Sequence, residues 1–283
     1  MTDDISQYKL TEQQLAQIES EIKTSQPLTS SLLPIGTLAR QYSTEAPDGG
    51  SFLTSSNLLA EKYASLRRIR GDGNCYYRAF LYSLCEGLFH QRMDGATDPP
   101  TDGEFHRIKQ LIHNSLSWVS AQGYEESTIE MFYEEVVDLL DFISIAGDRA
   151  ALHAKLNEEN STSDYCTWYL RVLTAAQMKS DPDRYLPFLL DEDGMMDIST
   201  FCSREVEPMN KECGMVQVAA LAEYFGVVVR IECMDGRVVN EKDGEGNWVR
   251  KVACHEFCGE DGGKRMHISL LYRPGHYDIL YLK

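Results

Sequence analysis

The sequence predicts an α+β fold, in which helices pack around a small, mostly antiparallel sheet. Three observations indicate this class. Helical periodicity dominates the middle of the chain, strand patterns become frequent only after Gly226, and two of those strands stand near the end. The chain has 283 residues, of which 43% are hydrophobic and 25% charged, so it is long enough to bury one large core.

A short helix is expected first. Thr11 and Gln14 form a capping box, and Pro27 stands just past the helix end. The apolar residues of this helix share one narrow stripe: Leu15, Ile18 and Ile22. The stripe packs either on the body of the protein or on a partner, and the sequence does not choose between them. We therefore divide the chain into an N-terminal helical arm, residues 1–26, and one domain, residues 27–283.

The other elements follow in chain order. Residues 43–56 are rich in Ser, Thr, Gly and Pro and are expected to form a loop. A buried helix is expected from Cys75, and helical patterns then recur at 105–120, 126–145, 150–157, 165–179 and 213–225. Strands are expected at 227–234, 266–272 and 277–282. The segment 237–265 is polar and Gly-rich, with one short strand near 248–252.

The charge balance excludes several partners. The chain has 27 basic and 44 acidic side chains and a net charge of −17, so it repels nucleic acid and anionic membranes. Its first residues show no signal-peptide pattern, and no apolar run is long enough to span a membrane. We expect a cytoplasmic protein, present also in the nucleus, whose eight cysteines are mostly reduced thiols.

One short loop offers the chemistry of a thiol nucleophile. Gly71-Asp72-Gly73-Asn74-Cys75 stands just before a predicted helix. Two glycines let successive N–H groups turn inward, and the positive end of a helix dipole favours a thiolate. The loop therefore combines a nucleophile, Cys75, with an oxyanion hole made of backbone N–H groups. The alternative is a glycine turn followed by a buried structural cysteine.

A nucleophilic cysteine needs a base, and the base needs an acceptor that orients it. Among seven histidines, His276 stands out because it lies between two predicted strands near the chain end. Residues two apart on a strand share a face, so Asp278 can hold one nitrogen of the ring. The alternative is a surface histidine at a turn.

Another cluster contains metal-ligand residue types: Cys254-His255-Glu256-Phe257-Cys258. No second pair of ligands stands at zinc-site spacing, so an irregular acidic loop is favoured over a metal site. We expect neither a metal nor an organic cofactor.

Four segments resemble the otubains, one branch of the ovarian-tumour (OTU) deubiquitinases. Asp72 to Phe80 (DGNCYYRAF) resembles the nucleophile motif of the OTU family, and Leu271 to Tyr281 (LYRPGHYDILY) resembles the otubain C-terminal motif. Val206-Glu207-Pro208-Met209 is a third match, and residues 8–27 are similar to the otubain N-terminal helix. The matches span nearly the whole chain, but 92–103 and 237–265 are longer than the otubain pattern.

The resemblance implies a papain-like cysteine-protease fold and hydrolysis of the bond between ubiquitin and lysine. It implies Cys75 as nucleophile, His276 as base and Asp278 as the orienting group. Asp72 is expected to act through its backbone at the oxyanion hole, together with Gly73, Asn74 and Cys75, and to brace the loop with its side chain. No cofactor is implied.

The resemblance also implies partners. It implies a preference for polyubiquitin of the proteasome-targeting linkage, and binding and inhibition of ubiquitin-conjugating enzymes. Tyr277 and the stripe of the N-terminal helix are expected to contact ubiquitin, and the protein is expected to be a monomer. Two other functions stay open: a ubiquitin-binding regulator without catalysis, and a cysteine hydrolase or acyltransferase acting on small molecules. The intact Cys75, His276 and Asp278 disfavour the first, and no motif supports the second.

Overall fold

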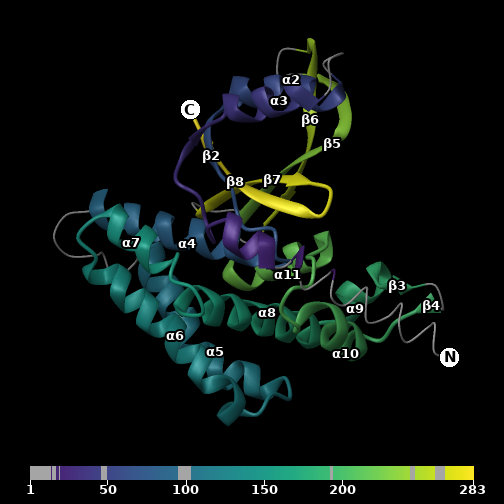
Figure 1. The fold of residues 1–283 in the computed structure, drawn as a ribbon. Coiled ribbons are helices and arrows are strands. Elements are labelled where there is room, and N and C mark those ends of the chain that lie inside the picture. The colour runs from purple at the N-terminus through teal and green to yellow at the C-terminus, as the bar shows by residue number, and fades with distance from the viewer. Residues whose placement is uncertain are drawn as a thin grey trace.

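The computed structural model describes residues 14, 17–18, 20–45, 50–94, 103–191, 194–242, 246–258 and 265–283. A sheet of six strands crosses the molecule, with helices on both of its faces (Figure 1). Its strands, in spatial order, are β1 (Leu33–Pro34), β2 (Tyr63–Arg67), β8 (His276–Leu282), β7 (His267–Arg273), β5 (Val228–Lys242) and β6 (Trp248–Phe257). Neighbouring strands are antiparallel except β5 and β7, so the expected α+β class with a mostly antiparallel sheet is confirmed.

The helices form two groups of unequal size (Figure 1). The larger group packs on one face of the sheet and comprises α4 (Cys75–Asp94), α5 (Glu104–Ala121), α6 (Glu126–Ile145), α7 (Arg149–Lys155), α8 (Thr162–Ser180) and α11 (Met215–Phe225). The smaller group, α2 (Gly36–Glu45) and α3 (Ser51–Lys62), covers the other face. None of the described helices combines the length and the apolar character that a membrane span requires.

Short elements connect α8 to α11. They are α9 (Pro182–Tyr185), the 3-10 helix η1 (Leu186–Phe188), strands β3 (Leu190–Asp191) and β4 (Gly194–Met195), α10 (Ile198–Phe201) and the π-helical turn η2 (Cys202–Val206). The helices expected after residue 100 are all present, with boundaries within about three residues of the predicted ones.

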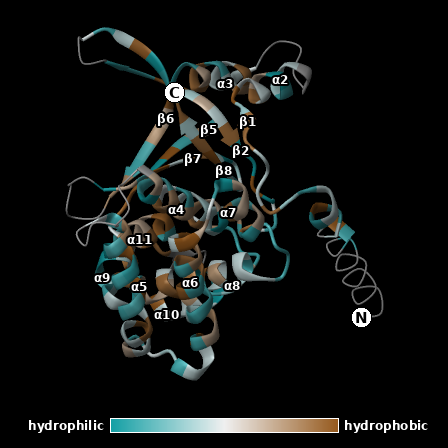
Figure 2. Ribbon diagram, turned by 90° about the vertical axis from the view of Figure 1, so that its left-hand side faces the viewer, coloured by the Kyte–Doolittle hydropathy of each residue, from teal (hydrophilic) through white to brown (hydrophobic). Residues whose placement is uncertain are grey.

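The central strands are buried on both faces. On β7, Leu270 faces the larger group of helices and Leu271 faces α2 and α3; on β8, Ile279 and Leu280 divide in the same way. Figure 2 shows apolar residues on β2 and among α4, α6 and α8, where the layers meet. Burial on both faces fixes the register of β8, and therefore the position of its first residue, His276, over the start of α4.

The prediction of one loop over residues 43–56 is wrong, because α2 continues to Glu45 and α3 begins at Ser51. Ser55 and Ser56 are fully buried in α3, and their hydroxyls donate to backbone carbonyls one turn earlier. This local bonding satisfies polar side chains inside a buried helix. The composition of the segment therefore indicated a loop where a helix forms.

The polar segment 237–265 is also more regular than expected. β5 extends to Lys242, and β6 runs from Trp248 to Phe257 and includes Cys254, so this part of the segment is a strand rather than an irregular loop. The two strands pair along most of their length, with an irregularity between Cys233 and Val238. Cross-strand pairing stabilises these residues despite their low strand propensity. Among the described residues, no group of three potential ligands is arranged to hold a metal.

The N-terminal helix ends where the sequence predicts. Residues 20–25 are helical, and Gln26 N–H donates to the carbonyl of Ile22 (3.0 Å). Ile18 is 52% exposed, whereas Ile22 is half-buried. Thr11 and Leu15 lie outside the described residues.

Candidate active site

Cys75 is the first residue of α4 and is 3% exposed. Its position at the start of a 20-residue helix is the one that the loop sequence predicts. Asn74 N–H already donates to Asp72 Oδ1 (3.0 Å). Among the described groups, none accepts the N–H of Asp72, Gly73 or Cys75. Of the four expected oxyanion-hole donors, the loop thus offers three, and Asn74 contributes to its shape instead.

His276 is the first residue of β8, and its ring bridges two functional groups. Nε2 donates to Asp278 Oδ1 (2.9 Å), and the ring lies close enough to the Cys75 thiol for the two groups to affect each other's charge state. Burial by itself would lower the pKa of His276, but the hydrogen bond to Asp278 and the interaction with Cys75 outweigh it and raise the pKa to about 9. The protonated ring is therefore stabilised beside the thiol, as a thiolate–imidazolium pair requires.

Asp278 is fully buried and accepts three hydrogen bonds. Besides His276, its donors are the Ile69 N–H (3.0 Å) and Arg273 Nη2 (2.5 Å). Burial raises the pKa of such a carboxyl, but the bond to His276 and the charge of Arg273 lower it below its ordinary value. Asp278 is thus held ionised in a fixed orientation, which fixes the tautomer and the plane of the His276 ring.

Arg273 is a functional residue that the sequence analysis does not identify, although the turn that follows it is a signal for its position. The turn between β7 and β8 consists of Pro274 and Gly275, and Gly275 has the positive φ (75°) that a tight turn needs. This turn pairs Arg273 with His276. Alternation then places Arg273, His276 and Asp278 on one face of the hairpin.

The side chain of Asp72 hydrogen-bonds a different set of residues from the His276–Asp278 pair. Its carboxylate accepts two bonds from Arg78 Nη1 (2.8 Å each) in addition to the bond from Asn74 N–H. Arg78 is 2% exposed and also bonds Asp164 (3.0 Å). The side chain of Asp72 therefore braces the loop, and Asp278 alone of these two carboxylates contacts the histidine.

The expectation that Tyr277 contacts ubiquitin is corrected by its burial. Its side chain is 2% exposed, and its hydroxyl donates to the carbonyl of Cys213 (3.2 Å). Because β8 alternates, Tyr277 points to the face opposite His276 and Asp278, where it packs in the core with Ile279. Tyr277 therefore packs in the core next to the site and has no exposed surface for a partner to contact.

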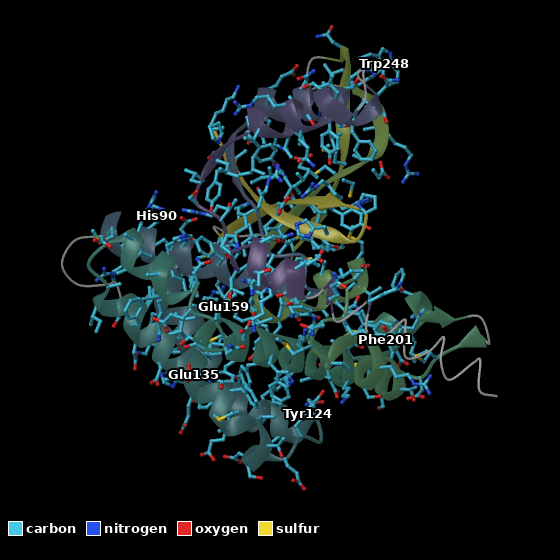
Figure 3. All side chains as sticks on the ribbon, viewed as in Figure 1. His90, Tyr124, Glu135, Glu159, Phe201 and Trp248 are labelled. Carbon is cyan, nitrogen blue, oxygen red and sulfur yellow. The ribbon has the colours of Figure 1, made fainter. Side chains whose placement is uncertain are left out.

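The end of the N-terminal helix runs beside the catalytic loop. Gln26 Oε1 accepts the N–H of Gly71 (3.1 Å), and the Gln26 carbonyl accepts bonds from Arg70, which is 4% exposed. Arg70 also pairs with Glu159 (3.0 Å for Nη1–Oε2), which Figure 3 labels beside the N-terminal helical segment. The arm is therefore anchored at its end, at residues 23–26, next to Gly71.

Two cavities flank this anchored segment. One, of about 480 Å³, is lined by His276, Gly71 and Gln26 among others. The other, of about 460 Å³, is lined by Asp72, Asn74 and Ile22 among others. The catalytic loop can thus be approached from two sides, as a substrate with a group on each side of the scissile bond requires.

Comparisons with known proteins agree with this geometry. The family model described as Peptidase C65 Otubain matches residues 21–282. The human protein named ubiquitin thioesterase OTUB1 is 34% identical over 264 residues, which are 93% of this chain and 86% of that protein. The Caenorhabditis elegans protein named ubiquitin thioesterase otubain-like is 32% identical over 287 residues, 100% of this chain and 90% of that protein.

Solved structures agree as well. A structure of h/ceOTUB1 with ubiquitin aldehyde and UBC13~Ub matches with a TM-score of 0.81 at 28% identity, over 98% of this chain and 99% of that one. A complex of ceOTUB1, ubiquitin aldehyde and UBC13~Ub matches with a TM-score of 0.79 at 30% identity, over 96% and 99% of the two chains. The resemblance seen in the motifs is confirmed, and the chain belongs to the otubain family, the C65 peptidases, which are cysteine-protease deubiquitinases.

Proposed function

We propose that this protein hydrolyses the isopeptide bond between the C-terminal glycine of ubiquitin and a lysine side chain. The observation that carries the proposal is the arrangement of three groups: Cys75 at the start of α4, the neighbouring His276 ring, and the buried Asp278 that accepts a hydrogen bond from this ring (2.9 Å). The relatives named ubiquitin thioesterase support ubiquitin as the substrate. The same arrangement argues against a regulator with vestigial catalysis.

The reaction uses groups of this chain alone. His276 takes the thiol proton, and the Cys75 sulfur attacks the glycine carbonyl of ubiquitin. Free N–H groups of the 72–75 loop stabilise the resulting oxyanion. Protonated His276 gives its proton to the leaving lysine amine, and a thioester remains on Cys75. Water, deprotonated by His276, then releases ubiquitin and regenerates the thiol.

We further propose that the preferred substrate is polyubiquitin of the proteasome-targeting linkage, and that the N-terminal arm binds the second, proximal ubiquitin. The arm is fixed to the body at Gln26, beside Gly71. Ile18 lies one turn before the half-buried Ile22, on the same stripe, and is 52% exposed. An apolar side chain presented to solvent next to an active site is suited to a partner that arrives with the substrate.

Cleavage of diubiquitins of every linkage tests this proposal. We expect the proteasome-targeting dimer to be cut at least about tenfold faster than the others, a difference of about 1.4 kcal/mol in transition-state binding. Cys75→Ala should cut none of them. Equal rates on all linkages would remove the linkage preference and leave the hydrolase intact.

A second, non-catalytic function is supported by the complexes that match this fold, which contain UBC13~Ub or UBCH5B~Ub. We propose that this chain also binds ubiquitin-charged conjugating enzymes and slows chain synthesis. Cys75→Ala should inhibit synthesis as strongly as the wild type, because this binding involves no thiol chemistry. If neither protein inhibits at micromolar concentration, the second function is excluded.

A further inference from the structure

A fully buried arginine lies behind the catalytic loop and has no part in the mechanism above. Arg171 comes from the middle of α8 and is 0% exposed. Its Nη1 donates to the carbonyl of Val206 (3.0 Å). Its Nη2 donates to the carbonyls of Gly73 (3.0 Å) and Lys211 (2.7 Å), and to Asn74 Oδ1 (2.9 Å). One guanidinium thus connects the catalytic loop with the segment that follows η2.

The peptide unit between Gly73 and Asn74 is held at both ends. Arg171 binds its carbonyl oxygen, and Asp72, itself held by Arg78, binds its N–H. Since a peptide unit is planar, these two bonds fix the orientation of the whole unit. The neighbouring peptide units, which carry the N–H groups of Gly73 and Cys75, are joined directly to this unit, so its fixed orientation restricts theirs.

Asn210 holds the same loop from the side of the 206–211 segment. Its backbone N–H donates to Asn74 Oδ1 (2.9 Å), and its side-chain oxygen accepts from Asn74 Nδ2 (2.8 Å). A Cβ on Gly73 would lie 2.3 Å from the Asn210 carbonyl oxygen. The loop therefore has no room to rotate away while Arg171 holds both segments.

Burying the charged side chain of Arg171 costs free energy, and packing alone does not explain why an arginine stands at this position. Among the described residues, no carboxylate forms an ion pair with Arg171, and its Nε has no partner. An apolar side chain at a buried position is commonly as stabilising as a buried ion. The acceptors of Arg171 belong to the catalytic loop and to the segment that covers it, which points to a role in placing that loop.

We propose that Arg171 is the positioning residue of the oxyanion hole: it holds the Gly73–Asn74 peptide so that the N–H groups of Gly73 and Cys75 face the substrate carbonyl. The proposal rests on the proposed function, because it concerns the tetrahedral intermediate of that reaction. The forked guanidinium is essential, since it reaches the carbonyls of Gly73 and Val206 through different nitrogens. A lysine keeps the charge but cannot reproduce this fork.

The test compares Arg171→Lys with the wild type in two reactions of the same thiol. Hydrolysis of ubiquitin bearing a C-terminal fluorophore passes through an oxyanion, whereas alkylation of Cys75 by iodoacetamide does not. We expect Arg171→Lys to lower kcat by about 10- to 100-fold with little change in KM, since one misplaced oxyanion donor has an effect of this order. The rate of alkylation at each pH from 5 to 9 should stay within about twofold of the wild type.

Arg92→Met is the matched control. Arg92 also donates to two main-chain carbonyls, those of Ser144 and Ala146, but at the end of α6. Its replacement should lower the melting temperature and leave kcat unchanged. The proposal is overturned if Arg171→Lys keeps its kcat, if its alkylation falls in parallel with hydrolysis, or if Arg92→Met loses as much kcat.

Two further arms keep the test decisive. If Arg171→Lys does not fold, Asn210→Gly removes the side chain that holds Asn74 while tolerating the positive φ of 64° at this position. It should lower kcat by about tenfold without affecting alkylation.

If the wild type does not cleave ubiquitin, the proposed function fails. Acylation of Cys75 by p-nitrophenyl acetate, which also forms an oxyanion, then shows whether Arg171→Lys is impaired.

Discussion

At the scale of single residues, the sequence predicts some members of the site and misses others. Cys75 and the His276–Asp278 pair were identified from local pattern, because a glycine loop before a helix and a two-residue spacing on a strand have direct geometric meaning. Arg171 was not, because it lies in an ordinary helical pattern and its partners in the catalytic loop, Gly73 and Asn74, lie almost 100 residues away in the chain. Only the packing of α8 behind α4 brings it to the loop.

The raised pKa of His276 predicts a pH dependence of stability. A histidine with a folded-state pKa of about 9 binds its proton more tightly than in the unfolded chain, where the value is near 6.5. Its contribution is therefore complete below pH 6.5 and is lost as the pH rises through about 9. The free energy of unfolding should fall in this window by up to about 1.4 kcal/mol per pH unit. Urea unfolding from pH 6 to 9.5 measures it.

The control for this titration is His276→Gln. Glutamine keeps a hydrogen-bond donor near Asp278 and does not titrate, so the decline between pH 6.5 and 9 should become flatter. An unchanged decline in His276→Gln would assign the effect to other groups.

At the scale of elements, the catalytic loop depends on Gly73 for two separate reasons: its positive φ and its close approach to Asn210. Gly73 has a φ of 78°, and an added Cβ would collide with the carbonyl oxygen of Asn210 at 2.3 Å. Gly73→Ala should therefore lower kcat by more than about 100-fold, since the oxyanion donors move. Steady-state hydrolysis of ubiquitin with a C-terminal fluorophore measures this.

Gly123→Ala separates the effect of a positive φ from the effect of a collision with a neighbouring segment. Gly123 has a similar positive φ of 95°, but nothing lies within 4 Å of its added Cβ. This variant should lose only about 1–2 kcal/mol of stability and keep its kcat. If Gly73→Ala behaves like Gly123→Ala, close packing of the loop against Asn210 has no catalytic role.

The N-terminal helix gives a second prediction at this scale. Ile18 is exposed and Ile22 lines a cavity beside Asp72. Ile18→Asp should raise KM for diubiquitin of the preferred linkage by about tenfold, whereas KM for a single ubiquitin with a C-terminal fluorophore and the melting temperature should not change. Equal losses on both substrates, with a lower melting temperature, would show that the stripe packs on the enzyme itself.

The individual helices were predictable because each carries its own periodicity. The helix α3 and the long β5–β6 pair were not, since their residues form regular structure only through contacts with other segments. Ser55 and Ser56 need the packing of α3 on the sheet, and the polar end of β5 needs β6 beside it.

At the scale of the whole molecule, the sheet order places the last strand in the middle. β8 lies between β2 and β7 and carries both His276 and Asp278. No local pattern reveals this order or the parallel pairing of β5 with β7, because both depend on contacts between distant segments. The sequence predicts the class of the fold and leaves its topology open.

Truncation tests the central position of β8. A chain that stops at Gly275 should lose cooperative unfolding and near-ultraviolet circular dichroism, because β2 and β7 lose their common neighbour and Ile279 leaves the core. A chain that stops at Tyr281 lacks only Leu282, which is 56% exposed, and Lys283. It should melt within about 5 °C of the full chain. Cooperative unfolding of the shorter chain at the full-length temperature would contradict this account.

The central claim is that Cys75, activated by His276, attacks the C-terminus of ubiquitin. The most direct measurement is reaction with ubiquitin carrying a C-terminal electrophile, followed by intact-mass and peptide mass spectrometry. The account predicts one ubiquitin per wild-type molecule, attached at Cys75, and no adduct in Cys75→Ala. An adduct in Cys75→Ala, attachment at the exposed Cys254 or Cys258, or no adduct in the wild type would contradict it.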